Sequence, residues 1–185
     1  MESQKSLFTN NKNKREMIDK SKNFLFSNYS KIISEFGNLD SKILILGISP
    51  VESHYNSESN SCFAFDISTS QTEKSGGVLC KTFDRLGIKI DEVLWDNLYK
   101  TPESLLDESS KMIARRYMEN FISIINPVII ICLGNDCETI VRKLRINENV
   151  IIRKVLHPGA VLRNFYTLQE YYVNWARLNL LKYIK

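Results

Sequence analysis

The sequence has few of the residues that mark several classes of protein. Its 185 residues include only four cysteines, four prolines, seven glycines and two histidines, and no Cys-x-x-Cys pair. This cysteine content is too low for a small disulfide-stapled protein. The pattern indicates reduced, mostly structural thiols, although a four-cysteine zinc or iron–sulfur site stays open at this point. The cysteines are Cys62, Cys80, Cys132 and Cys137.

Long hydrophobic runs are also missing. The longest apolar segments, such as residues 127–133, are far shorter than the roughly 20 residues that a membrane-spanning helix needs. The first residues lack the apolar core of a secretory signal peptide. We therefore expect no membrane contact and an intracellular protein, cytoplasmic or nuclear. With 43% hydrophobic and 25% charged residues, the chain has the composition of one folded globular domain and not of a disordered protein.

Positive charge is in excess only near the N-terminus. Residues 1–31 contain seven Lys or Arg and three acidic residues, and the remaining residues contain 18 of each sign, so the net charge of +4 belongs to this segment. A basic arm suits a polyanionic partner, but it equally suits a solvated leader, and the sequence leaves both interpretations open. We expect residues 1–13 to be a mobile basic leader and residues 14–185 to form a single domain.

Short apolar runs alternate with segments of helical periodicity. The apolar runs predict buried strands at residues 41–47, 92–98, 127–134 and 150–156. The helical segments are residues 14–36, 78–86, 102–125, 135–145 and 166–184. This alternation predicts an α/β fold with three layers, α/β/α, in which helices cover both faces of a central, mostly parallel four-stranded sheet.

In such a fold, ligands bind beyond the carboxyl ends of the strands. The segments that follow the predicted strands are therefore the candidate site, and they span residues 47–54, 97–102, 134–136 and 157–163. Residues 48–75 follow neither period, and a loop of this length inside a domain is usually functional. It contains an aromatic island at residues 63–65. Taken singly, each motif is equally well explained as a tight turn, a helix start or an ordinary loop.

The order of the motifs is more informative than any one of them. Gly47-x-x-Pro50 after a strand, an aromatic in the next loop, Asn97-x-x-Lys100 after a strand, an apolar strand ending in Leu-Gly, and His157-Pro-Gly after the last strand resemble the uracil-DNA glycosylase superfamily, especially its family 4 and family 5 branches. The resemblance covers about residues 42–165. It implies the uracil-DNA glycosylase fold and a monomeric enzyme that needs no cofactor or metal.

The activity that the resemblance implies is hydrolysis of the N-glycosidic bond of uracil, or of other deaminated bases, in DNA, which initiates base excision repair. Gly47, Ser49 and Pro50 match the loop that holds the hydrolytic water, with Ser49 where other branches have Asp, Asn or Ala. Glu52 matches an acidic position of family 4-like members, where a carboxylate steadies the sugar cation and orients water. His157 matches the histidine near uracil O2, which stabilises the departing anion.

The remaining matched positions bind the base and the DNA. Phe65 resembles the aromatic residue that stacks on the flipped base, and Asn97 the residue that reads its Watson–Crick edge. Lys100 and Arg163 are expected to contact DNA, and Leu162 to act as a wedge, in a loop that enters the minor groove.

The sequence also departs from the family 4 pattern. Residues 1–61 contain no cysteine, so the iron–sulfur cluster of that family is not expected. The second motif is shortened to Asn-Leu-Tyr-Lys-Thr-Pro, and His-Pro-Gly stands where His-Pro-Ser is commoner. These departures favour an alternative, a catalytically weak or inactive nucleic-acid-binding or scaffold protein on the same fold. A third hypothesis is a doubly wound domain for a nucleotide or another small phosphorylated ligand, but the chain has neither Gly-x-Gly-x-x-Gly nor a Walker-type motif.

Overall fold

The computed structural model describes residues 2–65 and 74–184, and of residues 2–11 only the backbone. A central sheet has five strands in the order β1-β3-β2-β4-β5. Strands β2 to β5 are parallel to their neighbours, and β1 pairs with β3 antiparallel. The four predicted parallel strands are confirmed, and the described residues add the two-residue edge strand β1. The strands are β1 (Phe36–Gly37), β2 (Ile43–Gly47), β3 (Leu94–Asn97), β4 (Ile129–Leu133) and β5 (Ile151–Val155).

Helices connect the strands and cover the sheet. The α-helices are α1 (Glu2–Leu25), α2 (Glu52–Tyr55), α3 (Ser75–Leu86), α4 (Glu108–Ile125), α5 (Asn135–Val141), α6 (Gly159–Leu162), α7 (Leu168–Ala176) and α8 (Leu181–Ile184). Short 3-10 turns lie at Cys62–Ala64, Ile90–Glu92 and Glu103–Leu105. Within the described residues, no helix is both long and apolar enough to cross a membrane.

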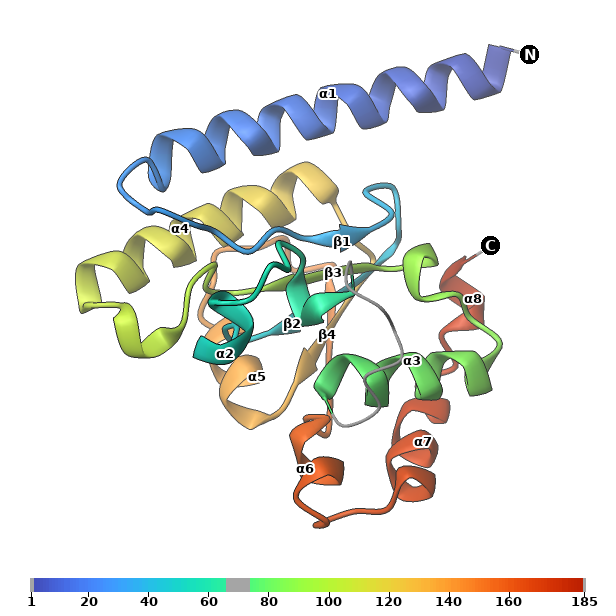
Figure 1. Ribbon diagram of the computed structural model, residues 1–185. Coiled ribbons are helices and arrows are strands. Elements are labelled where there is room, and N and C mark those ends of the chain that lie inside the picture. Colours follow the sequence, from blue (N-terminus) through green and yellow to red (C-terminus); the bar gives the residue numbers. More distant parts are fainter. Residues whose placement is uncertain (1, 66–73, 185) are drawn as a thin grey trace.

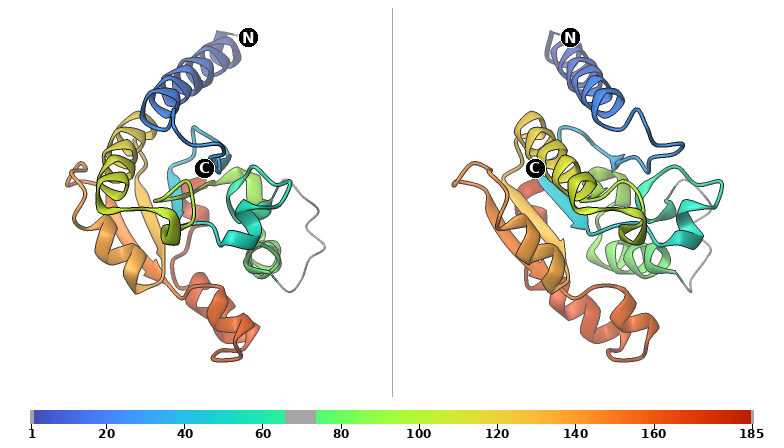
Figure 2. Two further views of the ribbon diagram at one scale, coloured as in Figure 1. Left: turned by 60° about the vertical axis from the view of Figure 1, so that its left-hand side comes forward. Right: turned by 90° about the vertical axis from the view of Figure 1, so that its left-hand side faces the viewer.

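The sheet separates two apolar cores, because successive side chains of a strand point to opposite faces. On β2, Leu44 and Leu46 face one core, and Ile43 and Ile45 face the other. Residues of α1, α4 and α5 complete the first core, and residues of α3 and α7 the second. The helices lie on the two sides of the sheet in Figures 1 and 2. The three-layer α/β/α prediction is therefore confirmed.

The N-terminal helix differs most from its prediction. It ends at Leu25, eleven residues before the predicted end, and an irregular segment leads from it to β1. Hydrogen bonds from later loops hold this segment: the Ile33 N–H donates to the Lys100 carbonyl, and the Cys62 N–H donates to the Ser34 carbonyl. Because these hydrogen bonds join segments far apart in the sequence, the sequence of this segment carries no periodic pattern that would reveal them. The helical backbone begins at Glu2, and the side chains of the predicted leader up to residue 11 lie outside the described residues.

The predicted C-terminal helix is divided into α7 and α8. Asn179, which lies between them, has a φ of 49°. This left-handed conformation cannot continue a right-handed helix, and asparagine tolerates it better than most residues. The chain can therefore turn, and Tyr171, Trp175 and Leu180 all reach the core beneath α3.

Phe83 tests the core between the sheet and α3. Its side chain is fully buried, and its ring centroid lies 4.9 Å from that of Trp95 and 5.1 Å from that of Trp175. Because Phe83→Ala leaves a cavity there, we expect the free energy of unfolding in urea to fall by about 3–5 kcal/mol. Phe24→Ala is the control, since Phe24 is 82% exposed, and it should change stability by less than about 0.5 kcal/mol. Equal losses in the two variants would contradict this core.

Candidate active site

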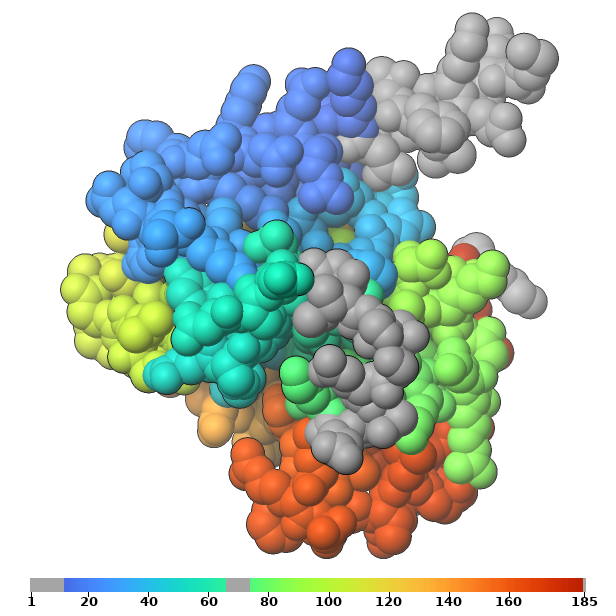
Figure 3. Space-filling model, in the orientation of Figure 1, coloured from blue at the N-terminus to red at the C-terminus, as the bar shows by residue number. Residues whose placement is uncertain are grey.

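A pocket of about 320 Å³ lies where the parallel strands β2 and β3 end. Its walls come from the loop after β2, from α2, from the Cys62–Ala64 turn, from the start of α3 and from the α6 segment. Figure 3 shows the face of the molecule on which the segments around α2 and α6 meet. The pocket brings together six residues that the sequence predicted for the site: Ser49, Pro50, Asn97, His157, Leu162 and Arg163.

Backbone pairing continues past the ends of β2 and β3 and holds the two loops together. Gly47 and Asn97 are partners in the parallel register. The Leu98 N–H donates to the Gly47 carbonyl at 3.0 Å, and the Tyr99 N–H donates to the Ile48 carbonyl at 2.8 Å. The loop after β2 therefore has a fixed position relative to Asn97, whose side chain lines the pocket although the residue is almost fully buried.

Position 47 requires glycine, because two pocket residues approach its backbone too closely to leave room for a side chain. A Cβ atom at this position would lie 2.5 Å from Asn97 Oδ1 and 2.8 Å from Cζ of Phe63. Gly76 plays a similar part at the start of α3, where a Cβ would lie 2.4 Å from the Phe63 carbonyl oxygen. The two glycines thus allow Asn97 and Phe63 to meet at the pocket.

Phe63, and not the predicted Phe65, lines the pocket. Phe65 is only 8% exposed, and its ring centroid lies 5.2 Å from those of Phe36 and Trp95. Phe63 has a φ of 57°, a conformation that is uncommon for a residue other than glycine. This local backbone turn accompanies the different placement of the two rings. Since both residues fit the aromatic-island pattern, the sequence offers no signal that selects between them.

The hydrogen bonding of His157 selects one tautomer. The Gly159 N–H donates to Nδ1 at 3.0 Å, so the neutral ring carries its proton on Nε2. Partial burial, followed by the positive charge of Arg163, lowers the pKa of His157. The neutral form therefore predominates at pH 7. Because the residue keeps exposed surface and lines the pocket, a ligand can reach the ring.

Glu52 does not line the pocket. It is the first residue of α2, and its Oε1 accepts a hydrogen bond from the Ser104 hydroxyl at 2.6 Å. The carboxylate is thus turned toward the Glu103–Leu105 turn, while the next residue, Ser53, faces the pocket. Within residues 12–65 and 74–184, no Asp or Glu lines the pocket.

The prediction that Lys100 contacts DNA is wrong. The residue is 1% exposed, and its ammonium group forms an ion pair with Asp96. The same group lies over the rings of Tyr117 and Phe121, 5.2 and 5.5 Å from their centroids. A lysine that is enclosed in this way cannot reach a phosphate. The Asn-x-x-Lys spacing that suggested a DNA contact instead places an ion pair beneath the pocket.

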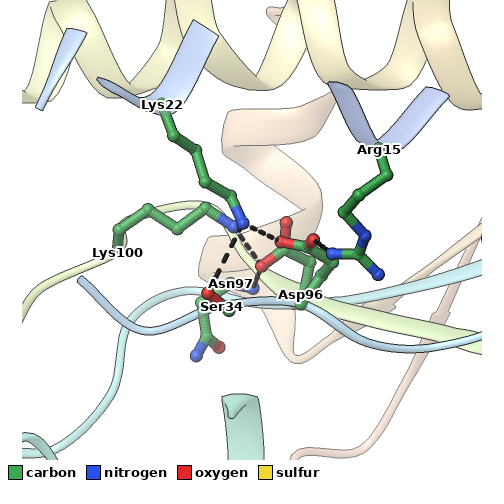
Figure 4. Close-up of polar contacts among 7 residues, drawn as sticks. Arg15, Lys22, Ser34, Asp96, Asn97 and Lys100 are labelled. Carbon is green, nitrogen blue, oxygen red and sulfur yellow. Dashed lines mark hydrogen bonds and ion pairs between the residues drawn. The ribbon is translucent and has the colours of Figure 1, made fainter. Parts of the chain in front are cut away.

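Part of the N-terminal positive charge is also used inside the protein. Lys14 pairs with Asp40 at 2.8 Å, Lys22 pairs with Glu35 at 2.5 Å, and Arg15 pairs with the other oxygen of Glu35. Figure 4 shows Arg15 and Lys22 reaching from the N-terminal helix toward the segment below it. These three side chains hold α1 against the rest of the domain. Neither an arm for a polyanionic partner nor a solvated leader predicts such internal ion pairs.

The cysteines lie on both sides of the sheet. Cys62 belongs to the core with α3, Cys132 and Cys137 to the core with α4, and Cys80 is partly exposed on α3. Burial raises the pKa of the Cys62 and Cys137 thiols. Among the residues that the structure describes, no three His, Cys, Asp or Glu side chains are grouped to hold a metal ion.

The tautomer and pKa of His157 can be measured together by long-range ¹H–¹⁵N NMR. We expect a pKa below the ordinary value of 6.5 and a neutral ring protonated on Nε2. Arg163→Gln should raise this pKa, because a nearby positive charge is removed. Arg116→Gln on α4, outside the pocket lining, should leave it unchanged. A neutral ring protonated on Nδ1 would contradict the geometry.

Comparison with protein families agrees with this geometry. The family model described as the Uracil DNA glycosylase superfamily matches residues 34–178, a span that contains the five strands and the pocket. The search of curated proteins gave no match. Helix α1 lies before the matched span. From the extent of this match, and from a pocket at the carboxyl ends of a parallel sheet, the chain belongs to the uracil DNA glycosylase superfamily.

Proposed function

We propose that this protein is a DNA glycosylase that hydrolyses the N-glycosidic bond of uracil in DNA. The observation that carries the proposal is that an amide, a neutral histidine and an aromatic ring share one pocket: Asn97, His157 and Phe63. A flipped base needs these kinds of group, since it is recognised by hydrogen bonds to its edge and by stacking on apolar side chains. Superfamily membership supports both the glycosylase chemistry and a DNA partner.

Base recognition is assigned to Asn97 and Phe63. The amide of Asn97 has an acceptor oxygen and a donor NH₂, which complement the neighbouring N3–H donor and carbonyl acceptor of uracil. Phe63 offers a ring on which the base stacks, an interaction worth about 1–3 kcal/mol. That contribution offsets part of the few kcal/mol that unstacking the base costs.

Bond cleavage is assigned to His157 and to the loop after β2. As the bond from the sugar C1′ to the base breaks, negative charge develops on uracil and positive charge on the sugar. The Nε2–H of His157 donates a hydrogen bond to the uracil oxygen on which charge develops. Because the pKa of His157 is lowered, its ring is neutral, and it donates this hydrogen bond without transferring a full proton. Water held at Ser49 and Pro50 then adds to C1′, and the proton that it loses is taken up by the departing uracil anion, so that an abasic sugar and neutral uracil are formed.

The rim of the pocket is assigned to DNA binding. Leu162 is 39% exposed and Arg163 is exposed beside it, and both line the pocket. An apolar side chain at this place fills the gap that the flipped base leaves in the duplex, and an arginine neutralises a nearby phosphate. Lys100 takes no part, since it is buried.

Release of uracil from an oligonucleotide, measured under single-turnover conditions as strand scission after alkali, tests the proposal. We expect Asn97→Ala and His157→Leu each to lower the rate by about 10²-fold or more, because each removes a group that binds the transition state. Asn120→Ala on the exposed side of α4 is the matched control and should keep the wild-type rate. Wild-type protein that makes no abasic product at high excess, on single- and double-stranded DNA alike, would sink the proposal.

Glu52→Gln asks whether the carboxylate on α2 takes part. Because that carboxylate bonds to Ser104 and lies outside the pocket, we expect a single-turnover rate close to that of the wild type. A loss of about 10²-fold, the size typical of a general acid or base, would return Glu52 to the mechanism. Glu58→Gln in the following exposed loop controls for the change of charge.

A second candidate function is DNA binding without base release. It is favoured by the pocket lining, in which no carboxylate of the described residues stands ready to activate water. In that case, affinity would be salt-dependent, and Arg163→Gln would reduce the salt slope by about one without any product forming.

A further inference from the structure

A cluster of buried charges lies behind Asn97. Asp96, the preceding residue, is fully buried. Its Oδ1 accepts a hydrogen bond from the backbone N–H of Asn97 at 2.8 Å and pairs with the ammonium group of Lys100. Among the described residues, none donates a hydrogen bond to Oδ2. The Asp96 carboxylate is therefore oriented by Lys100, and the backbone of Asn97 is bonded to the same oxygen.

The cluster continues to the N-terminal helix through Glu35 and Lys22. Both are buried and pair at 2.5 Å, and Figure 4 shows Lys22 and Lys100 pointing toward the same place beside Asp96. Burial would raise the pKa of Glu35, but Lys22 and Lys100 outweigh it and lower the pKa to about 2. Burial raises the pKa of Asp96, Lys100 lowers it, and Glu35 raises it further. The two ion pairs therefore act on each other as one unit.

Backbone contacts join the same segments. The Ile33 N–H donates to the Lys100 carbonyl at 2.8 Å, two residues before Glu35. On the other side, Tyr99 donates to Ile48 in the loop after β2. The short segment from Asn97 to Lys100 is therefore held between the pocket loop and the chain that carries Glu35.

We propose that Lys22 is a positioning residue for Asn97, acting through Glu35, Asp96 and Lys100. Helix α1 lies before the span that matches the superfamily, so this gives the helix a part in the site itself. Without the Lys22 ammonium group, the ion-pair partner left to Glu35 among the described residues is Arg15, whose side chain is 46% exposed. Glu35 and Asp96 then lose a positive charge that acts on both. Unpaired buried charges rearrange or draw in water. The oxygen that accepts the hydrogen bond from the Asn97 backbone N–H belongs to this unit. When it moves, the Asn97 backbone loses a fixed partner, and the side-chain amide that this backbone carries loses its fixed orientation.

The activity test rests on the proposed function and uses the full chain. Lys22→Met should lower the single-turnover rate of uracil release by about tenfold or more, because even small displacements of a positioned group are costly. Lys20→Met, at an exposed position of the same helix, should have no such effect, and Lys22→Arg should restore most of the rate. In an Asn97→Ala background, Lys22→Met should have no further effect. An equal effect in both backgrounds would overturn the proposal.

A second measurement does not depend on activity. In ¹H–¹⁵N spectra, Lys22→Met should shift the backbone and side-chain amide resonances of Asn97, whereas Lys20→Met should not. Should Lys22→Met fail to fold, Arg15→Gln removes the other partner of Glu35 and should shift the same resonances less. Unshifted Asn97 resonances in a folded variant would overturn this inference. If the wild-type protein releases no base but Lys22→Met still shifts the Asn97 resonances, only the proposed function is overturned.

Discussion

The parallel pairing of β2 with β3 brings Gly47 opposite Asn97 at the end of both strands, and the pocket depends on this close approach. With no Cβ at Gly47, the Asn97 amide and the Phe63 ring occupy the space that a side chain would fill. The hydrogen bonds that continue past the strand ends hold the Ser49–Pro50 loop in a fixed place relative to that amide. A preorganised site of this kind needs little rearrangement when a ligand enters, and in the proposed glycosylase reaction such preorganisation would stabilise the departing anion.

Charge in this protein serves the interior as much as the surface. The net charge of +4 comes from residues 1–31, yet Lys14, Arg15 and Lys22 pair with acids of the domain. Such pairs contribute little net stability when they are buried, but removing one partner leaves an uncompensated charge. The pair of Lys22 with Glu35 joins α1 to the irregular segment after it, and the pair of Lys100 with Asp96 joins β3 to the loop that follows it, beneath the pocket.

The sequence predicted the regular elements well because their signals are local. Apolar runs identified the parallel strands, and α3 ends at Leu86 as predicted, before Gly87, whose φ is 70°. Motif order led to the same superfamily as the family comparison. What failed has a common cause. The chain after Leu25 is held by hydrogen bonds to distant loops. Lys100 pairs with Asp96 four residues before it, but the rings that enclose it, those of Tyr117 and Phe121, belong to α4. Periodicity carries no information about such distant contacts.

By itself, the sequence determined the α/β class, the parallel strands and the loops in which the site lies, because burial patterns and strand-end motifs depend on residues that are close together in the sequence. Only the tertiary structure decided which side chains enter the pocket. Phe63, which has a left-handed backbone, lines the pocket in place of Phe65. The Ser104 hydroxyl bonds to Glu52 and holds its carboxylate outside the pocket. Lys100 is buried in an ion pair with Asp96. The Ser104–Glu52 hydrogen bond and the enclosure of Lys100 by Tyr117 and Phe121 are contacts between segments distant in sequence, and such contacts exist only once the chain has folded.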